Sequence, residues 1–98
     1  MSKFGELIDL EIPVLLDFYT ESSEKNTSTH QTLKDVASAL GDKAKVIKID
    51  VDKNKALAGA LRVQGVPSFI LYKKGEMLWR FSGEQDANSL IAIVEKHI

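Results

Sequence analysis

The sequence contains no cysteine among its 98 residues. That absence excludes disulfides, thiolate catalysis and cysteine-based metal sites in this chain. Histidine is almost as scarce, because His30 and His97 are the only two and they lie far apart in the sequence. We therefore expect neither a metal site nor a cofactor.

Long apolar runs are also missing, and no segment is long enough for a signal peptide or a membrane span. Lys and Arg total 13 against 14 Asp and Glu, which gives a net charge of -1. This balance offers no argument for binding nucleic acid or an anionic membrane. We predict a cytoplasmic monomer, a single domain over residues 1–98, and neither nucleic acid nor membrane as a partner.

One stretch dominates the apolar pattern. Val14 to Phe18 is a short apolar run that follows Pro13 and is interrupted by Asp17. Its length and its β-branched and aromatic residues predict a strand buried on both faces. A carboxylate in such a strand is unfavourable unless it is paired, hydrogen-bonded or protonated. Asp17 is therefore the first residue that needs an explanation.

The remaining pattern alternates between helical and extended segments. Helical spacing predicts helices over residues 3–10, 23–41 and 54–62, and a last helix that begins near Asp86 or Asn88. Apolar runs predict strands over residues 46–52, 68–72 and 77–81, with a hairpin turn over 73–76. The order αβαβαββα indicates an α/β fold, with a mixed sheet, helices on both faces and a closing antiparallel hairpin.

The chain resembles the thioredoxin family in several of these blocks. The matching blocks are Val14-Leu15-Leu16-Asp17-Phe18-Tyr19, Ile49-Asp50-Val51-Asp52, Val63-Gln64-Gly65-Val66-Pro67-Ser68-Phe69, Tyr72-Lys73-Lys74-Gly75-Glu76 and Gly83. The resemblance runs from Phe4 to the C-terminus and implies a thioredoxin-like fold with a four-stranded core sheet. The extra N-terminal strand of longer thioredoxins is not matched, which predicts that residues 46–51 form an exposed edge.

The cysteine pair of the family is replaced. Thioredoxins carry Trp-Cys-Gly-Pro-Cys at the start of the long helix, and the matching segment here is Ser22-Ser23-Glu24-Lys25-Asn26. Ser23 and Asn26 take the two cysteine positions, and Gln31 takes that of the family's mid-helix proline. Because the whole motif differs, we favour a natural loss over an engineered change. Disulfide exchange needs two thiols, so we expect no catalytic residue and interpret Ser22 or Ser23 as a helix cap.

Other family features are retained. Asp17 and Lys48 match the family's buried acid and the lysine placed near it, so we expect Asp17 to be hydrogen-bonded or paired with Lys48. We also expect burial to raise the pKa of Asp17 and Lys48 to offset part of that rise. Pro67 matches a cis-proline whose preceding residue, here Val66, offers its backbone to an extended peptide. Alternatively, Pro67 only shapes the start of the following strand.

The resemblance implies a candidate binding face, which comprises Ser22, Ser23, Glu24, Lys25, Val66, Pro67 and Gly83. Our first functional hypothesis is a thioredoxin-like protein without redox activity that binds a protein or an extended peptide. The alternative is a thiol–disulfide oxidoreductase role in cell redox homeostasis, which requires that the cysteines were engineered out or that a partner supplies thiols. A third possibility is that residues 23–26, at a helix amino end, hold an anion or a glutathione-like ligand.

Three further expectations concern residues outside that face. We interpret His30 as a solvated helix residue and Trp79 as a core residue. Asp50 and Asp52 resemble a metal pair only in isolation, and we interpret both as turn and cap residues.

Overall fold

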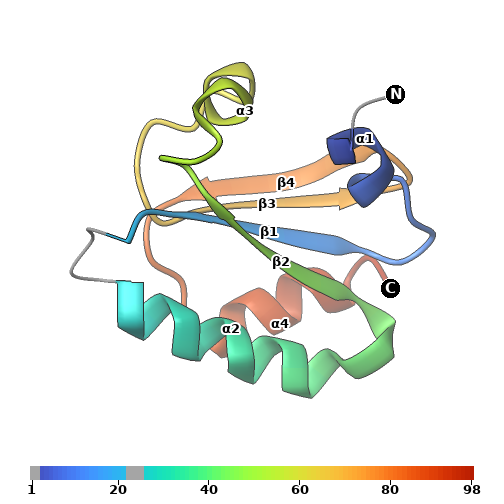
Figure 1. Ribbon diagram of the computed structural model, residues 1–98. Helices are drawn as coiled ribbons and strands as arrows, with labels where there is room; N and C mark the ends of the chain where they lie inside the picture. Colours follow the sequence, from blue (N-terminus) through green and yellow to red (C-terminus); the bar gives the residue numbers. More distant parts are fainter. Residues whose placement is uncertain (1–2, 22–25) are drawn as a thin grey trace.

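The computed structural model describes residues 3–21 and 26–98. The central sheet has the strand order β2-β1-β3-β4; β1 and β2 are parallel, and the other neighbours are antiparallel. Helices α1 and α3 cover one face of the sheet, and α2 and α4 cover the other (Figure 1). The elements are α1 (Lys3–Ile8), β1 (Val14–Tyr19), α2 (Asn26–Leu40), the 3-10 turn η1 (Gly41–Lys43), β2 (Lys45–Asp50), α3 (Lys55–Ala60), β3 (Ser68–Lys73), β4 (Glu76–Ser82) and α4 (Ala87–Glu95). The predicted element order and mixed sheet are confirmed.

Strand β1 divides the apolar core into two clusters. Its side chains alternate between the two faces of the sheet, so Leu15 packs toward α2 and α4, whereas Val14, Leu16 and Phe18 pack toward α1 and α3. All four of these side chains are completely buried. The prediction that this strand is buried on both faces is therefore confirmed.

Helix α2 is regular over its described length although its first half has poor helix propensity. Leu33, Val36 and Leu40 are buried in the cluster shared with α4, and this packing stabilises the helix. Thr29 is also buried, in the half that lacks an apolar stripe. Gly41 follows the helix with a φ of 54°, which is the conformation expected of a residue just after a helix end. The expected cap at Ser22 or Ser23 lies outside the described residues.

Strand β2 is shorter than predicted and ends at Asp50. The Asp50 side chain accepts a hydrogen bond from the backbone N–H of Asp52 at 2.8 Å, which turns the chain away from the sheet. The β3–β4 hairpin turn has positive φ at both Lys74 and Gly75, where only the glycine was anticipated. Asp86 caps α4 by accepting a hydrogen bond from Ser89 N–H at 2.7 Å.

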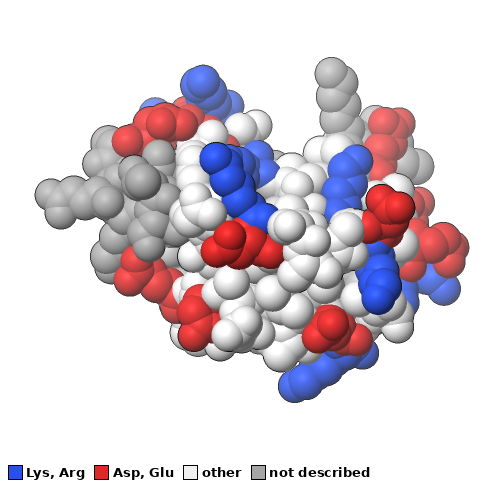
Figure 2. Space-filling model, turned by 90° about the horizontal axis from the view of Figure 1, so that it is seen from below, with Lys and Arg blue, Asp and Glu red and all other residues white. Residues whose placement is uncertain are grey.

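In the described part of the chain, β2 pairs only with β1 and forms one edge of the sheet, as predicted. Charged groups of both signs are interspersed on the face seen from the side of α2 and α4, with no gathering of one sign (Figure 2). Within the described ranges, no helix has the length and apolar character needed to cross a membrane.

Candidate functional site

The loop before β3 is joined to the end of β4 by hydrogen bonds. The peptide bond between Val66 and Pro67 is cis. The carbonyl oxygen of Pro67 accepts a hydrogen bond from Gly83 N–H at 2.9 Å. The Ser68 hydroxyl donates to the carbonyl of Gly65 and lies 3.1 Å from the hydroxyl of Ser82. Two of the residues expected in the binding face, Pro67 and Gly83, are therefore in direct contact.

Val66 lies at the rim of this arrangement. Its side chain is half-buried, and no backbone hydrogen bond joins Val66 to another residue of the described chain. Beside it is an open depression of about 320 Å³, formed where three loops meet at one end of the sheet. The lining residues are Thr20, Val51, Asp52, Val63, Gln64, Gly65 and Val66. The N–H and C=O of Val66 can therefore pair with an extended backbone without breaking a bond to these residues.

An aromatic pair that the sequence analysis did not assign to the site lies next to Gly83. The rings of Trp79 and Phe81 are parallel within 4° with centroids 6.2 Å apart, and Phe81 is 43% exposed. Trp79 is half-buried against the α2–α4 cluster rather than fully in the core. Gly83 has a φ of 125°, and a Cβ atom there would lie 3.3 Å from Phe81 Cε2. Alternation along β4 could have indicated that Phe81 shares a face with Trp79.

Asp17 is completely buried in the centre of β1. Burial raises its pKa from 3.8 to about 7, and the positive charge of Lys48 opposes that rise. Lys48 is its register partner on β2. However, neither carboxylate oxygen has a hydrogen-bond partner in the described part of the chain. The expectation of a hydrogen-bonded or ion-paired acid is thus wrong for the described residues, because the Lys48 ammonium group lies toward another partner.

That partner is His30 on α2, whose Nδ1 lies 3.4 Å from Lys48 Nζ. The His30 ring also packs edge-to-face on Tyr19, with centroids 5.0 Å apart. Burial, and then the charge of Lys48, lower the pKa of His30. The expectation of a solvated histidine is therefore met only in part, because His30 is half-buried. His30 lies three residues before Leu33, so the stripe of α2 continues through it, and this spacing could have indicated its burial.

Asp50 and Asp52 serve the turn after β2, as expected. Asp50 accepts the backbone hydrogen bond from Asp52 described above, and the hydroxyl of Thr20 donates to Asp52 Oδ2. This second bond joins the ends of β1 and β2 beside the depression. Ser22, Ser23, Glu24 and Lys25, the other members of the expected face, lie outside the described residues, as does most of the segment proposed to hold an anion.

These features define a thioredoxin-like domain: a mixed four-stranded sheet between two helical layers, with a cis-proline loop at one end and a buried acid in the central strand. The family model described as Thioredoxin matches residues 1–96. The chain therefore belongs to the thioredoxin family.

Individual relatives agree with that assignment. Chloroplastic thioredoxin Y of Oryza sativa subsp. japonica is 38% identical over 95 residues, which are 96% of this chain and 56% of that protein. A thioredoxin-like protein of Synechocystis sp. is 37% identical over 79 residues, or 81% of this chain and 75% of that protein. The structure of a mutant thioredoxin from Halobacterium salinarum NRC-1 is 34% identical, with a TM-score of 0.80 and coverage of 99% of this chain and 84% of that one.

The chain spans about half the length of the first curated relatives it matches, from 52% to 59% of the thioredoxin Y proteins. Those proteins are named chloroplastic. The cytoplasmic location of this chain stays a prediction.

Proposed function

We propose that this chain is a thioredoxin-family protein without redox activity, and that it binds an extended segment of a partner protein at the face formed by Val66, Pro67 and Gly83. The observation that carries the proposal is a combination of one retained feature and one absent feature. The cis-proline loop is present with the backbone of Val66 unpaired among the described residues, while the chain has no cysteine.

The chemistry of the absent thiols supports the first half of the proposal. Thiol–disulfide exchange begins with a thiolate that attacks a disulfide sulfur. A serine hydroxyl needs a positioned base to act as a nucleophile near pH 7. His30 is not hydrogen-bonded to any serine hydroxyl of the described residues, because its Nδ1 faces Lys48, its Nε2 has no partner among them and its ring packs on Tyr19. The chain has no group of its own that can exchange electrons with a disulfide.

The geometry of the loop supports the second half. Strand-like pairing with a partner needs an unpaired N–H and C=O on a backbone held in place. The hydrogen bond between Pro67 and Gly83 holds the loop, and Val66 offers both groups. The exposed Phe81 and the side chains of Val63 and Val66 add apolar area next to that backbone. This apolar area suits partner side chains that flank the paired residue. Polar side chains also line the depression, namely those of Thr20, Asp52 and Gln64.

Two experiments test the two halves separately. In an insulin-reduction assay with dithiothreitol as the electron donor, we expect no acceleration above the buffer rate; clear turnover would refute the redox-inactive half.

For binding, the wild-type chain and two variants serve as baits in a cell extract. Val66→Asp places a charge in the face, and Ala60→Asp makes the same charge change on the exposed surface of α3. We expect a partner to be recovered by the wild type and by Ala60→Asp, but not by Val66→Asp. Equal recovery by all three baits would show that the proline face is not the binding site.

A further inference from the structure

The open edge of β2 is a second surface, and its residues are separate from those of the proposed face. Parallel strands bond alternate residues to the same neighbour. Lys45 N–H donates to Pro13 and Val51 N–H donates to Tyr19, both at 2.9 Å. The odd-numbered residues of β2 therefore bond to β1. The backbone N–H and C=O groups of Val46 and Lys48 point away from the sheet.

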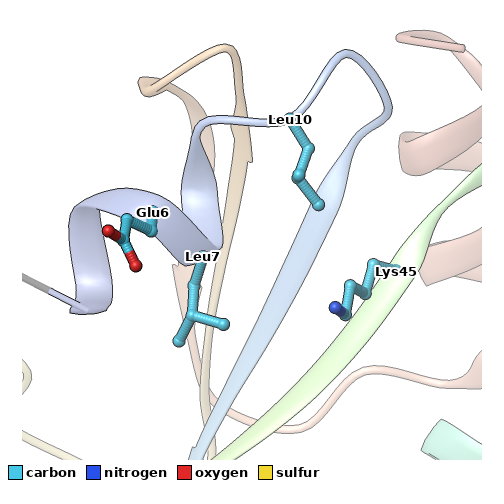
Figure 3. A pocket seen from close by; sticks show the side chains of 4 residues that line it. All are labelled: Glu6, Leu7, Leu10 and Lys45. Atoms are coloured by element: carbon cyan, nitrogen blue, oxygen red, sulfur yellow. The ribbon is translucent and has the colours of Figure 1, made fainter.

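The open edge has an apolar hollow on its α1 side, with a volume of about 330 Å³. In Figure 3 the side chains of Leu7, Leu10 and Lys45 point toward one another from α1, the loop after it and β2. Leu7 is 37% exposed. We call this hollow the α1-side groove; it is lined by Glu6, Leu7, Leu10 and Lys45.

A second hollow, of about 160 Å³, lies along the same strand on its α2 side. Val46 packs with the cluster under α2, which shows that this hollow and the α1-side groove lie on opposite faces of the sheet. We call it the α2-side pocket; it is lined by His30, Leu33, Lys34, Ala37, Val46 and Lys48.

Among the described residues, the charged side chains that line the α2-side pocket are those of two lysines. Lys34 and Lys48 are both exposed, and no carboxylate of the described residues lines the pocket. No carboxylate of the described chain forms an ion pair with either lysine. The only carboxylate of β2, Asp50, is buried and already bonded to the following turn. An acidic side chain from a partner would therefore meet two exposed ammonium groups, while the carboxylates that act on this pocket, Asp17 and Glu21, lie outside its described lining.

We propose that the β2 edge binds, by strand addition, an extended partner segment in which an acidic side chain has apolar neighbours in sequence. Residues on an added strand point to the same face as the residues opposite them, and successive residues alternate faces. An acidic residue opposite Val46 or Lys48 thus enters the α2-side pocket, while its neighbours point to the α1-side groove. A second copy of this chain is a poorer occupant, because it would bring the lysines of two β2 strands together.

The test uses the full chain, two blocked peptides and amide NMR. The first peptide is Thr-Leu-Glu-Leu-Thr and the second carries Lys in place of Glu. We expect the first peptide to shift the amides of Val46 and Lys48 most strongly and the second to bind more weakly. Lys48→Glu is expected to reverse this preference, weakening the first peptide about two- to fivefold, as for an exposed ion pair. Lys96→Glu, the same charge change at the end of α4, is expected to leave the preference unchanged.

Val46→Pro removes an N–H that points away from β1, so we expect loss of binding while the β1 pairing remains. If this variant fails to fold, the reversal in Lys48→Glu decides the matter. The proposal is overturned if the amides of β2 do not shift at millimolar peptide, or if shifts appear only at Val66 and Gly83. Equal binding of both peptides also overturns the proposal. Amide shifts that depend on protein concentration alone overturn it as well, because they would indicate that a second copy of this chain occupies the edge. None of these outcomes counts against the proline-face proposal.

Discussion

Replacing the buried carboxylate with its uncharged isostere, Asp17→Asn, tests the electrostatics of the central strand most directly. Asp17 is completely buried and has no hydrogen-bond partner in the described part of the chain. Its pKa is about 7 in the folded protein against an ordinary value of 3.8. The folded state therefore binds this proton more tightly than the unfolded state does. It follows that the free energy of unfolding falls as the pH rises through that window.

The magnitude follows from the same two pKa values. At about 1.4 kcal/mol for each pKa unit, ionising Asp17 lowers the free energy of unfolding by roughly 4 kcal/mol between acid pH and pH 8. Asparagine cannot ionise, so Asp17→Asn escapes this loss, although its buried amide costs roughly 1–3 kcal/mol if it finds no partner. That cost does not change with pH. The free energy of unfolding of the variant relative to the wild type should rise by about 3 kcal/mol between pH 4.5 and pH 8.

Urea denaturation of both proteins at several pH values measures this difference, and a carbon NMR titration of the Asp17 carboxyl group measures the pKa directly. Asp42→Asn removes one exposed carboxylate and corrects for the change in net charge. The reasoning is refuted if the stability difference does not vary with pH, or if the carboxyl group titrates near its ordinary value.

Three other changes test separate parts of the structure. Lys48→Met removes the charge that opposes the raised pKa of Asp17, so carbon NMR should show a pKa higher still, and a fall would contradict the assigned role. Gly83→Ala places a Cβ atom against Phe81 at a φ of 125°. We expect it to lower the free energy of unfolding, measured in urea, by roughly 1–3 kcal/mol. As a control, Gly59→Ala, in α3 with open space around it, should raise the free energy of unfolding by roughly 0.5–1 kcal/mol. Leu90→Ala removes a fully buried side chain between α4 and α2. We expect it to lower the free energy of unfolding by roughly 2–5 kcal/mol in the same measurement. A decrease below about 1 kcal/mol would mean that this cluster is loosely packed.

The fold was largely predictable because its signals are local. The apolar run from Val14 to Phe18, the turn at Gly75 and the cap at Asp86 each belong to one short segment, and each formed as expected. Strand ends were less predictable. Val51 continues the apolar pattern of β2, but the side chain of Asp50 bonds to the next turn and ends the strand.

The candidate site was predictable only where the family resemblance supplied residues. That resemblance pointed to Val66, Pro67 and Gly83, but not to Phe81, whose importance comes from its exposure beside Gly83. The partial burial of His30 was not predicted because it depends on Tyr19, on a different element. Contacts of this kind join residues distant in sequence, and periodicity along one segment does not encode them.

The sequence by itself determined that these 98 residues carry no thiol, since no folding can supply a missing cysteine. It also determined the alternation of helices and strands, because apolar spacing follows the period of each element. Only the tertiary structure decided where Lys48 directs its charge, toward His30 on α2 instead of into an ion pair with Asp17. It also decided that the outer edge of β2 is unpaired among the described residues and lies between two hollows of different character. The physical reason is that charge and exposure depend on neighbours in space, which the chain acquires only when its layers pack.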